Sequence, residues 1–153
     1  MATPINRDYP DRPFTAALAV CRRGDRVLLA QRAKGPSPAI GKWGFPGGMQ
    51  EVGETILAAA ARELSEETGI AAEPLRVVDA FDVIGKAPDG RIRAHFTLVC
   101  VVLEWREGEG AAIEDATAVG WYTAEDAVAK LELFPDTLRL MKAALALRVP
   151  PGA

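Results

Sequence analysis

Three glutamates fall within one turn of a predicted helix: Glu63, Glu66 and Glu67. Each helical residue is rotated by about 100° from the last, so positions i, i+3 and i+4 share one face. Carboxylates this close repel one another and destabilise a helix by roughly 0.2–0.5 kcal/mol per pair. Mg²⁺ prefers oxygen ligands and is usually held by one or two carboxylates plus substrate phosphates. The spacing therefore suggests a bound cation, although a bare glutamate-rich face is more often solvated surface.

The neighbouring residues favour a binding site over a solvated face. The segment Phe45-Pro46-Gly47-Gly48 must turn tightly and bring backbone close to another group. Arg62 stands among the acids, and its planar guanidinium could hold Glu54 or Glu66 in a set orientation. Gly69 is placed to end the helix as a glycine at the C′ position does. A solvated acidic face would need none of these companions.

From Gly48 to Ile70 these positions read G-x5-E-x7-R-E-L-x-E-E-x-G-I. The pattern resembles the box of the Nudix hydrolase family, GX5EX7REUXEEXGU, where U is a bulky aliphatic residue; Leu64 and Ile70 occupy the two U positions. The resemblance covers roughly residues 14–147. It implies an enzyme that cleaves the pyrophosphate bond of a nucleoside diphosphate linked to another group, with Mg²⁺ or Mn²⁺ as cofactor.

The family pattern also implies roles for the box residues. The implied metal ligands are the Gly47 carbonyl and the carboxylates of Glu63, Glu66 and Glu67, with Glu66 acting directly or through metal-bound water. Arg62 and Glu54 are implied to brace these ligands. Divalent metal activates the attacking water and neutralises charge on the phosphoryl oxygens. All five acidic and basic residues are thus candidates for catalysis.

The general base differs among family members: it is Glu63 in some and an acid from a later loop in others. Glu114 and Asp115 lie about where the family often places such an acid, and they are candidates for the substrate site. Charged loop residues are also common on ordinary surfaces. Similar sequences often carry an acid three positions before Trp121, where this chain has Ala118.

Four further residues could contact substrate: Arg32, Trp43, Phe45 and His95. Arg32 ends a predicted strand and could meet a phosphate. Trp43 and Phe45 could stack on a base, although aromatic residues in apolar company are more often core. His95 could line the substrate site, but a half-buried structural histidine is the more common case.

Composition suggests one globular domain with a hydrophobic core. The chain has 153 residues, of which 49% are hydrophobic and 25% charged, and a net charge of −3. This balance predicts no general attraction to nucleic acid or anionic membrane. The polar N-terminus lacks the apolar stretch of a signal peptide, and no apolar run reaches about 18 residues, so a cytoplasmic location is expected. Cys21 and Cys100 lie in apolar runs and are predicted to be buried free thiols.

The predicted elements give an α/β fold. Strands are expected at 14–22, 26–32, 75–84, 93–105 and 117–122, with a short extended piece at 43–48. Helices are expected at 55–68, at 124–131 capped by Thr123, and from Asp136, as cap, to about residue 147. Residues 104–114 are predicted as a loop, 1–13 as a flexible leader and 148–153 as a loose tail. This order suits an α/β/α sandwich with a mixed β-sheet, as the Nudix resemblance also implies.

Segments outside the box suggest a substrate. The spans from Val83 to His95 and from Trp121 to Thr137 are similar to small bacterial Nudix proteins grouped with ADP-ribose pyrophosphatases. The resemblance therefore favours cleavage of ADP-ribose to AMP and ribose 5-phosphate. The alternative is a nucleoside triphosphate pyrophosphohydrolase that removes oxidised dNTPs. A non-catalytic nucleotide sensor is disfavoured, because the box is intact and no basic face is evident. Small Nudix proteins are often homodimers, so a homodimer is possible for this chain, and the sequence does not decide its oligomeric state.

Overall fold

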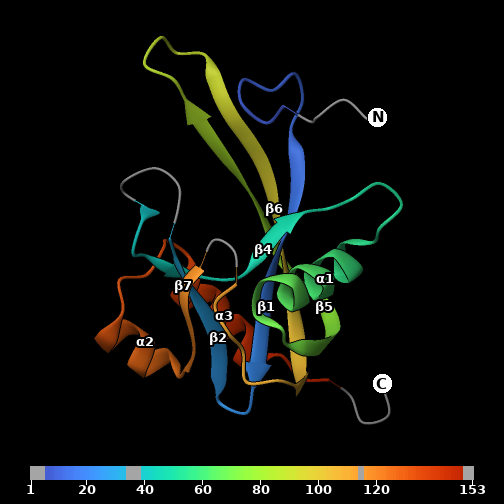
Figure 1. The fold of residues 1–153 in the computed structure, drawn as a ribbon, viewed down its shortest axis with the longest axis vertical. Coiled ribbons are helices and arrows are strands. Elements are labelled where there is room, and N and C mark those ends of the chain that lie inside the picture. The colour runs from blue at the N-terminus through green and yellow to red at the C-terminus, as the bar shows by residue number, and fades with distance from the viewer. Residues whose placement is uncertain (1–5, 34–38, 114–115, 150–153) are drawn as a thin grey trace.

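The structure is a computed structural model that describes residues 6–33, 39–113 and 116–149 (Figure 1). Within this part of the chain a seven-stranded mixed sheet and three helices form the fold. The strands are β1 (Phe14–Arg23), β2 (Arg26–Arg32), β3 (Trp43–Gly44), β4 (Gly47–Met49), β5 (Ala71–Lys86), β6 (Ile92–Glu107) and β7 (Ala116–Tyr122). The helices are α1 (Ile56–Thr68), α2 (Ala124–Lys130) and α3 (Thr137–Ala146).

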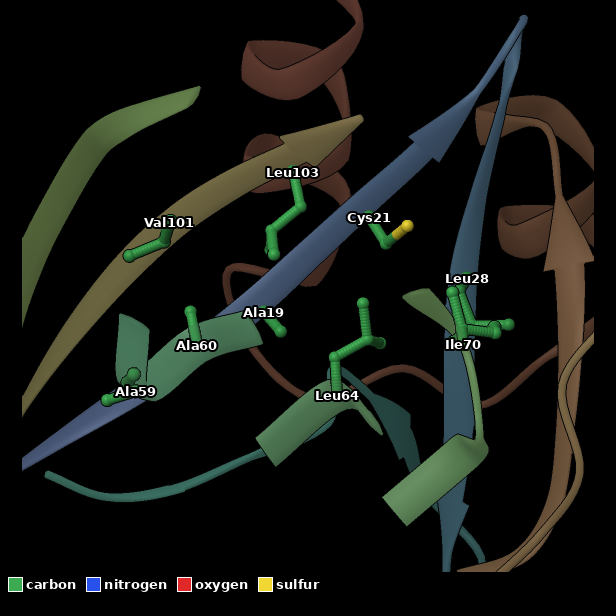
Figure 2. Close-up of a cluster of buried hydrophobic side chains, with 10 residues drawn as sticks. Ala19, Cys21, Leu28, Ala59, Ala60, Leu64, Ile70, Val101 and Leu103 are labelled. Carbon is green, nitrogen blue, oxygen red and sulfur yellow. The ribbon is translucent and has the colours of Figure 1, made fainter. Parts of the chain in front are cut away.

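The sheet has the strand order β3-β2-β1-β6-β5, with β4 also paired to β1 and β7 to β2. The β1–β6 pair is parallel and the other pairs are antiparallel. Side chains alternate between the two faces of β1. Ala19 and Cys21 belong to a buried cluster with Leu64 of α1 (Figure 2), whereas Val20 packs with Met141 of α3. The predicted α/β/α sandwich with a mixed sheet is confirmed.

Helix α1 forms where the sequence predicted it, because its ends are set by local signals. The Thr55 hydroxyl accepts a hydrogen bond from the N–H of Ala58 (3.1 Å) at the N-terminus. Gly69 ends the helix in the left-handed conformation at φ 75°, and its N–H donates to the carbonyl of Ser65. Ala59 and Ala60 are fully buried, and their small side chains let the helix lie close to the sheet.

The β5–β6 hairpin is longer than predicted. The ladder runs from the pair Ala71–Glu107 to the pair Lys86–Ile92, so β6 continues past its predicted end at residue 105 through residues 106–107, predicted only as loop. Pro74 lacks an N–H, but β5 is an edge strand and its pairing adjusts there by a shift in register. In Figure 1 the tip of this hairpin projects beyond the rest of the sheet.

The last helix begins at the predicted place but without the predicted cap. Asp136 is the N-cap residue, yet it has φ 69° and its side chain makes no capping hydrogen bond. Its carboxylate accepts hydrogen bonds from Arg139 instead. The prediction for α2 is confirmed, because the Thr123 hydroxyl accepts from the N–H of Asp126 (3.1 Å).

Both cysteines are free and buried, as predicted. Burial raises the pKa of the Cys21 and Cys100 thiols to about 12, so both are neutral at pH 7. The described part of the leader is held to the hairpin, where the Tyr9 N–H donates to the carbonyl of Arg93. Flexibility of the leader and of the tail stays a prediction. No helix among the described residues is long and apolar enough to cross a membrane, and a cytoplasmic location stays a prediction.

Candidate active site

The guanidinium of Arg62 is the centre of the carboxylate cluster on α1. It binds Glu54 with two hydrogen bonds, from Nε (2.7 Å) and from Nη2 (3.0 Å). Its Nη1 donates to Glu63 (2.9 Å) and to Glu66 (3.2 Å), and Nη2 also donates to the carbonyl of Met49 (3.0 Å). One planar cation thus fixes three carboxylates relative to the backbone of β4.

Glu54 is held in the loop before α1 by contacts of its own. Its side chain accepts from the N–H of Glu51 (3.2 Å), and its carbonyl accepts from the side-chain amide of Gln50 (2.7 Å). The hydrogen bond from Arg62 is the main reason that the pKa of Glu54 lies below its usual value, and the same contact raises the pKa of Arg62. Glu54 therefore stays ionised at neutral pH, and the pair is lost only as the pH falls through that lowered pKa.

The two glycines of β4 lie directly against the acids. The N–H of Gly47 donates to Oε2 of Glu67 (3.0 Å). A Cβ at Gly48 would come within 2.3 Å of Cδ and 2.4 Å of Oε1 of Glu63, so any other residue there would displace the Glu63 carboxylate. The segment is fixed to β1, because the carbonyl of Pro46 accepts from the N–H of Ala19 (2.8 Å). The close approach expected from the glycine-rich segment is therefore an approach to the box glutamates.

The donor set suits a hard divalent cation, since α1 carries three carboxylates on one face, and the absence of a side chain at Gly48 makes space for the Glu63 carboxylate. Glu63 and Glu67 are the two predicted ligands that contact β4, and the side chain of Glu66 is 52% exposed. Within the described residues no three His, Cys, Asp or Glu side chains are gathered as a ready metal site. The roles of Glu63, Glu66, Glu67 and the Gly47 carbonyl as metal ligands stay predictions.

The NUDIX domain family matches residues 11–144 of this chain. The chain belongs to the Nudix family. The resemblance carried by the box is thereby confirmed, and the chain is a pyrophosphohydrolase that acts on small-molecule nucleotides.

Individual Nudix relatives differ in the substrate that they are named for. The chain is 38% identical to the 8-oxo-dGTP diphosphatase of Proteus vulgaris over 91 aligned residues. The alignment covers 60% of this chain and 76% of that protein. It is 30% identical to the ADP-ribose pyrophosphatase of Methanocaldococcus jannaschii over 104 aligned residues. This alignment covers 68% of this chain and 58% of that protein. A crystal structure of a MutT NUDIX hydrolase from Burkholderia pseudomallei matches with a TM-score of 0.72 and 28% identity, covering 87% of this chain and 98% of that one.

Arg62→Lys is expected to lower turnover about 10- to 100-fold and to shift the metal dependence to higher concentration. Lysine keeps the charge but cannot form the two-pronged contact with Glu54 while also reaching Glu63. Steady-state kinetics over a metal titration measure both effects. Arg106→Lys, in an exposed ion pair with Glu73, is the matched control. A rise in KM alone, at unchanged metal dependence, would mean that Arg62 contacts substrate instead.

The two aromatic candidates lie away from the Nudix box acids. Trp43 and Phe45 pack against the hydrophobic cluster that α2 and α3 cover, on the opposite face of the sheet from α1. Trp43 also meets Tyr122 edge to face, with ring centroids 5.6 Å apart. These contacts match the alternative reading of core aromatics, and a role in substrate binding stays a prediction.

Arg32 and His95 lie on different strands, Arg32 at the end of β2 and His95 in β6. The Arg32 guanidinium lies 5.9 Å from the ring centroid of Phe134, which in turn covers Gly44. His95 lies on β6 with its Nε2 3.7 Å from Oδ1 of Asp82, and its side chain is 29% exposed. That exposure agrees with a half-buried histidine. Contact of either residue with substrate stays a prediction.

Glu114 and Asp115 lie outside the described residues, and their role stays a prediction. The residues on either side of them are described. The N–H of Ile113 donates to the carbonyl of Glu67 (3.2 Å), and Ala116 pairs with Arg32 in the sheet.

Sequence reasoning missed two backbone contacts to the Nudix box. One is the carbonyl of Met49, which accepts from Arg62. The other is the approach of residues 108–113 to the end of α1, where two N–H groups meet helix carbonyls. Gly108 and Gly110, at φ 98° and 94°, are the signal that could have marked a close approach there.

Proposed function

We propose that this chain is a metal-dependent pyrophosphohydrolase that uses Mg²⁺ or Mn²⁺ and cleaves ADP-ribose to AMP and ribose 5-phosphate. One observation supports the metal dependence above all: three glutamates share a face of α1, and each is held in place. Glu63 and Glu66 bind the guanidinium of Arg62, and Glu67 binds the N–H of Gly47. An acidic cluster so constrained, with the Glu63 carboxylate against Gly48, suits capture of a cation rather than exposure to solvent.

The chain's own residues would then act as follows. Glu63 and Glu67 hold the cation, which when bound activates water and neutralises charge on the phosphoryl oxygens. Arg62 keeps the carboxylates in one arrangement, and Glu54 keeps Arg62 in place by its two hydrogen bonds. The N–H of Gly47 fixes the Glu67 side chain against β4. This bracing means that little rearrangement is needed when metal and substrate bind.

The preference for ADP-ribose rests on charge and on the resemblance outside the box. A triphosphate brings more negative charge than a diphosphate ester and calls for more cationic contacts. Arg62 is already committed to the box acids, while Arg91 and Arg93 pair with Asp89 and Asp8. Metal ions can also neutralise an additional phosphate, which reduces the number of cationic side chains that a triphosphate needs.

A second candidate is hydrolysis of oxidised nucleoside triphosphates. It is favoured by the 38% identity to a protein named as an 8-oxo-dGTP diphosphatase, against 30% for the relative named as an ADP-ribose pyrophosphatase.

Side-by-side kcat/KM values for ADP-ribose, NADH, 8-oxo-dGTP and the common dNTPs decide between the two candidates. We expect ADP-ribose to lead, with AMP and ribose 5-phosphate as products by mass spectrometry. A nucleoside monophosphate plus pyrophosphate would instead be the products from a triphosphate. A lead of tenfold or more for any triphosphate, about 1.4 kcal/mol of transition-state preference, would replace the ADP-ribose proposal. The same samples should be run in sedimentation, since a homodimer stays a prediction.

A further inference from the structure

Residues 108–113, here called the strap, lie across the C-terminal end of α1. The N–H of Ala111 donates to the carbonyl of Thr68 (3.0 Å), and that of Ile113 to the carbonyl of Glu67 (3.2 Å). The last four carbonyls of a helix have no partner within the helix. The strap therefore supplies two of the missing donors, and one of them reaches a residue of the acidic cluster.

Close contact between the strap and the last box residues depends on two glycines. A Cβ at Gly108 would meet the carbonyl oxygen of Gly69 at 3.1 Å, and one at Gly110 would meet Cδ1 of Ile70 at 3.0 Å. Both glycines have positive φ, which other residues rarely adopt. The strap is thus shaped to lie against the end of the helix.

Two tryptophans from different strands hold the start of the strap. Nε1 of Trp105 in β6 donates to the carbonyl of Gly108 (2.6 Å), and Nε1 of Trp121 in β7 donates to the carbonyl of Glu109 (3.0 Å). Both side chains also pack against the hydrophobic cluster beneath α1. The two indoles therefore join the strap to the sheet.

Arg23 joins the two tryptophans. Its guanidinium lies 3.8 Å from the ring centroid of Trp105 and 5.7 Å from that of Trp121, and Nη1 binds Oε1 of Glu109 at 3.0 Å. A guanidinium over an aromatic face is attracted to the ring, so Arg23 stabilises the placement of both indoles. Side chains from β1, β6 and β7 thus converge on the first two residues of the strap.

Glu67 is held from two directions as a result. Its side chain accepts from the N–H of Gly47, and its carbonyl accepts from the N–H of Ile113 in the strap. We propose that Trp105, Trp121 and Arg23 are positioning residues for Glu67, acting through the strap on the metal site. This inference rests on the proposed metal-dependent function, because its consequence is a change in metal affinity.

Trp121→Phe tests the inference, since it keeps an aromatic ring and removes the N–H that binds Glu109. Mn²⁺ affinity is measured by electron paramagnetic resonance of the free ion, without substrate. We expect the dissociation constant to rise several-fold, up to about tenfold, and the amides of Ala111 and Ile113 to exchange hydrogen faster. At saturating metal, KM for substrate should be unchanged and turnover should recover.

Tyr122→Phe is the matched control, because Tyr122 is the next residue of β7 and packs on the opposite face of the sheet. It should bind Mn²⁺ as the wild type does. Folded Trp121→Phe with Mn²⁺ affinity within twofold of wild type would overturn the inference. Should Trp121→Phe not fold, Arg23→Gln replaces it. Mn²⁺ affinity is measured in the same way, and an affinity within twofold of wild type would again overturn the inference. A wild type that neither binds Mn²⁺ nor hydrolyses nucleotides would instead overturn the proposed function.

Discussion

Glu67→Gln is expected to lower kcat by at least about 100-fold while the protein still folds. The amide oxygen of glutamine can still accept the hydrogen bond from the N–H of Gly47, so the contact between α1 and β4 survives. The negative charge that would hold the cation is lost. Without metal the variant should be slightly more stable, by roughly 0.2–0.5 kcal/mol, because repulsion between Glu63 and Glu67 is relieved.

Steady-state kinetics over a Mg²⁺ and Mn²⁺ series, with thermal unfolding in EDTA, check both halves of this result. Glu132→Gln is the matched control, since Glu132 is exposed and lies outside the box. It should leave kcat unchanged. Turnover near the wild-type value in folded Glu67→Gln, or wild-type activity undiminished by excess EDTA, would contradict the mechanism.

The box helix could be predicted from the sequence because its determinants are local. Thr55, Gly69 and the alanines between them set its ends and its buried face within one short segment. Helical spacing also placed Glu63, Glu66 and Glu67 near Arg62 without knowledge of the sheet. The planar guanidinium of Arg62 also suggested that it holds Glu54 or Glu66, and the structure shows both contacts.

Features that depend on distant segments could not be predicted in this way. Asp136 suits an N-cap by residue type, but its carboxylate binds Arg139 and its backbone takes a left-handed conformation. Arg139 is in turn held by Asp79 of β5 (2.6 Å), which is far away in the sequence. Residues 106–107 were predicted only as part of a polar loop, yet pairing with β5 extends β6 through them. The strap shows the same limit, because its hydrogen bonds to α1 join residues more than forty positions apart. In each case the outcome depends on tertiary contacts that outweigh local propensity.

The aromatic residues near the box show a further reason why parts of the site could not be predicted from the sequence. Trp43 and Phe45 are only a few residues from Gly48, the position that faces Glu63. Alternation along the extended chain turns the side chains of Trp43 and Phe45 toward the other face of the sheet. Closeness in sequence to the acids therefore did not imply closeness in space. The register of β3 and β4 against β2 and β1 decides which face each side chain occupies.

Gly48→Ala is expected to lower kcat/KM on the order of 100-fold, since misplacement of a catalytic group by about 1 Å can cost that much. An alanine Cβ would lie 2.3 Å from Cδ of Glu63, far inside any allowed contact. The Glu63 carboxylate must move, and its hydrogen bond from Nη1 of Arg62 must move with it. The effect should appear as weaker metal binding as well as slower turnover, because the carboxylate is displaced rather than removed.

Gly85→Ala in β5 is the matched control for this variant. A Cβ there would meet the Ala94 Cβ at 3.6 Å, an ordinary van der Waals contact, and no positive φ is required. We expect kcat/KM of Gly85→Ala to stay within twofold of wild type. Kinetics and Mn²⁺ binding on both variants separate a general cost of adding a methyl group from a specific clash with Glu63. Activity of Gly48→Ala within threefold of wild type would show that the position of Glu63 does not limit the reaction.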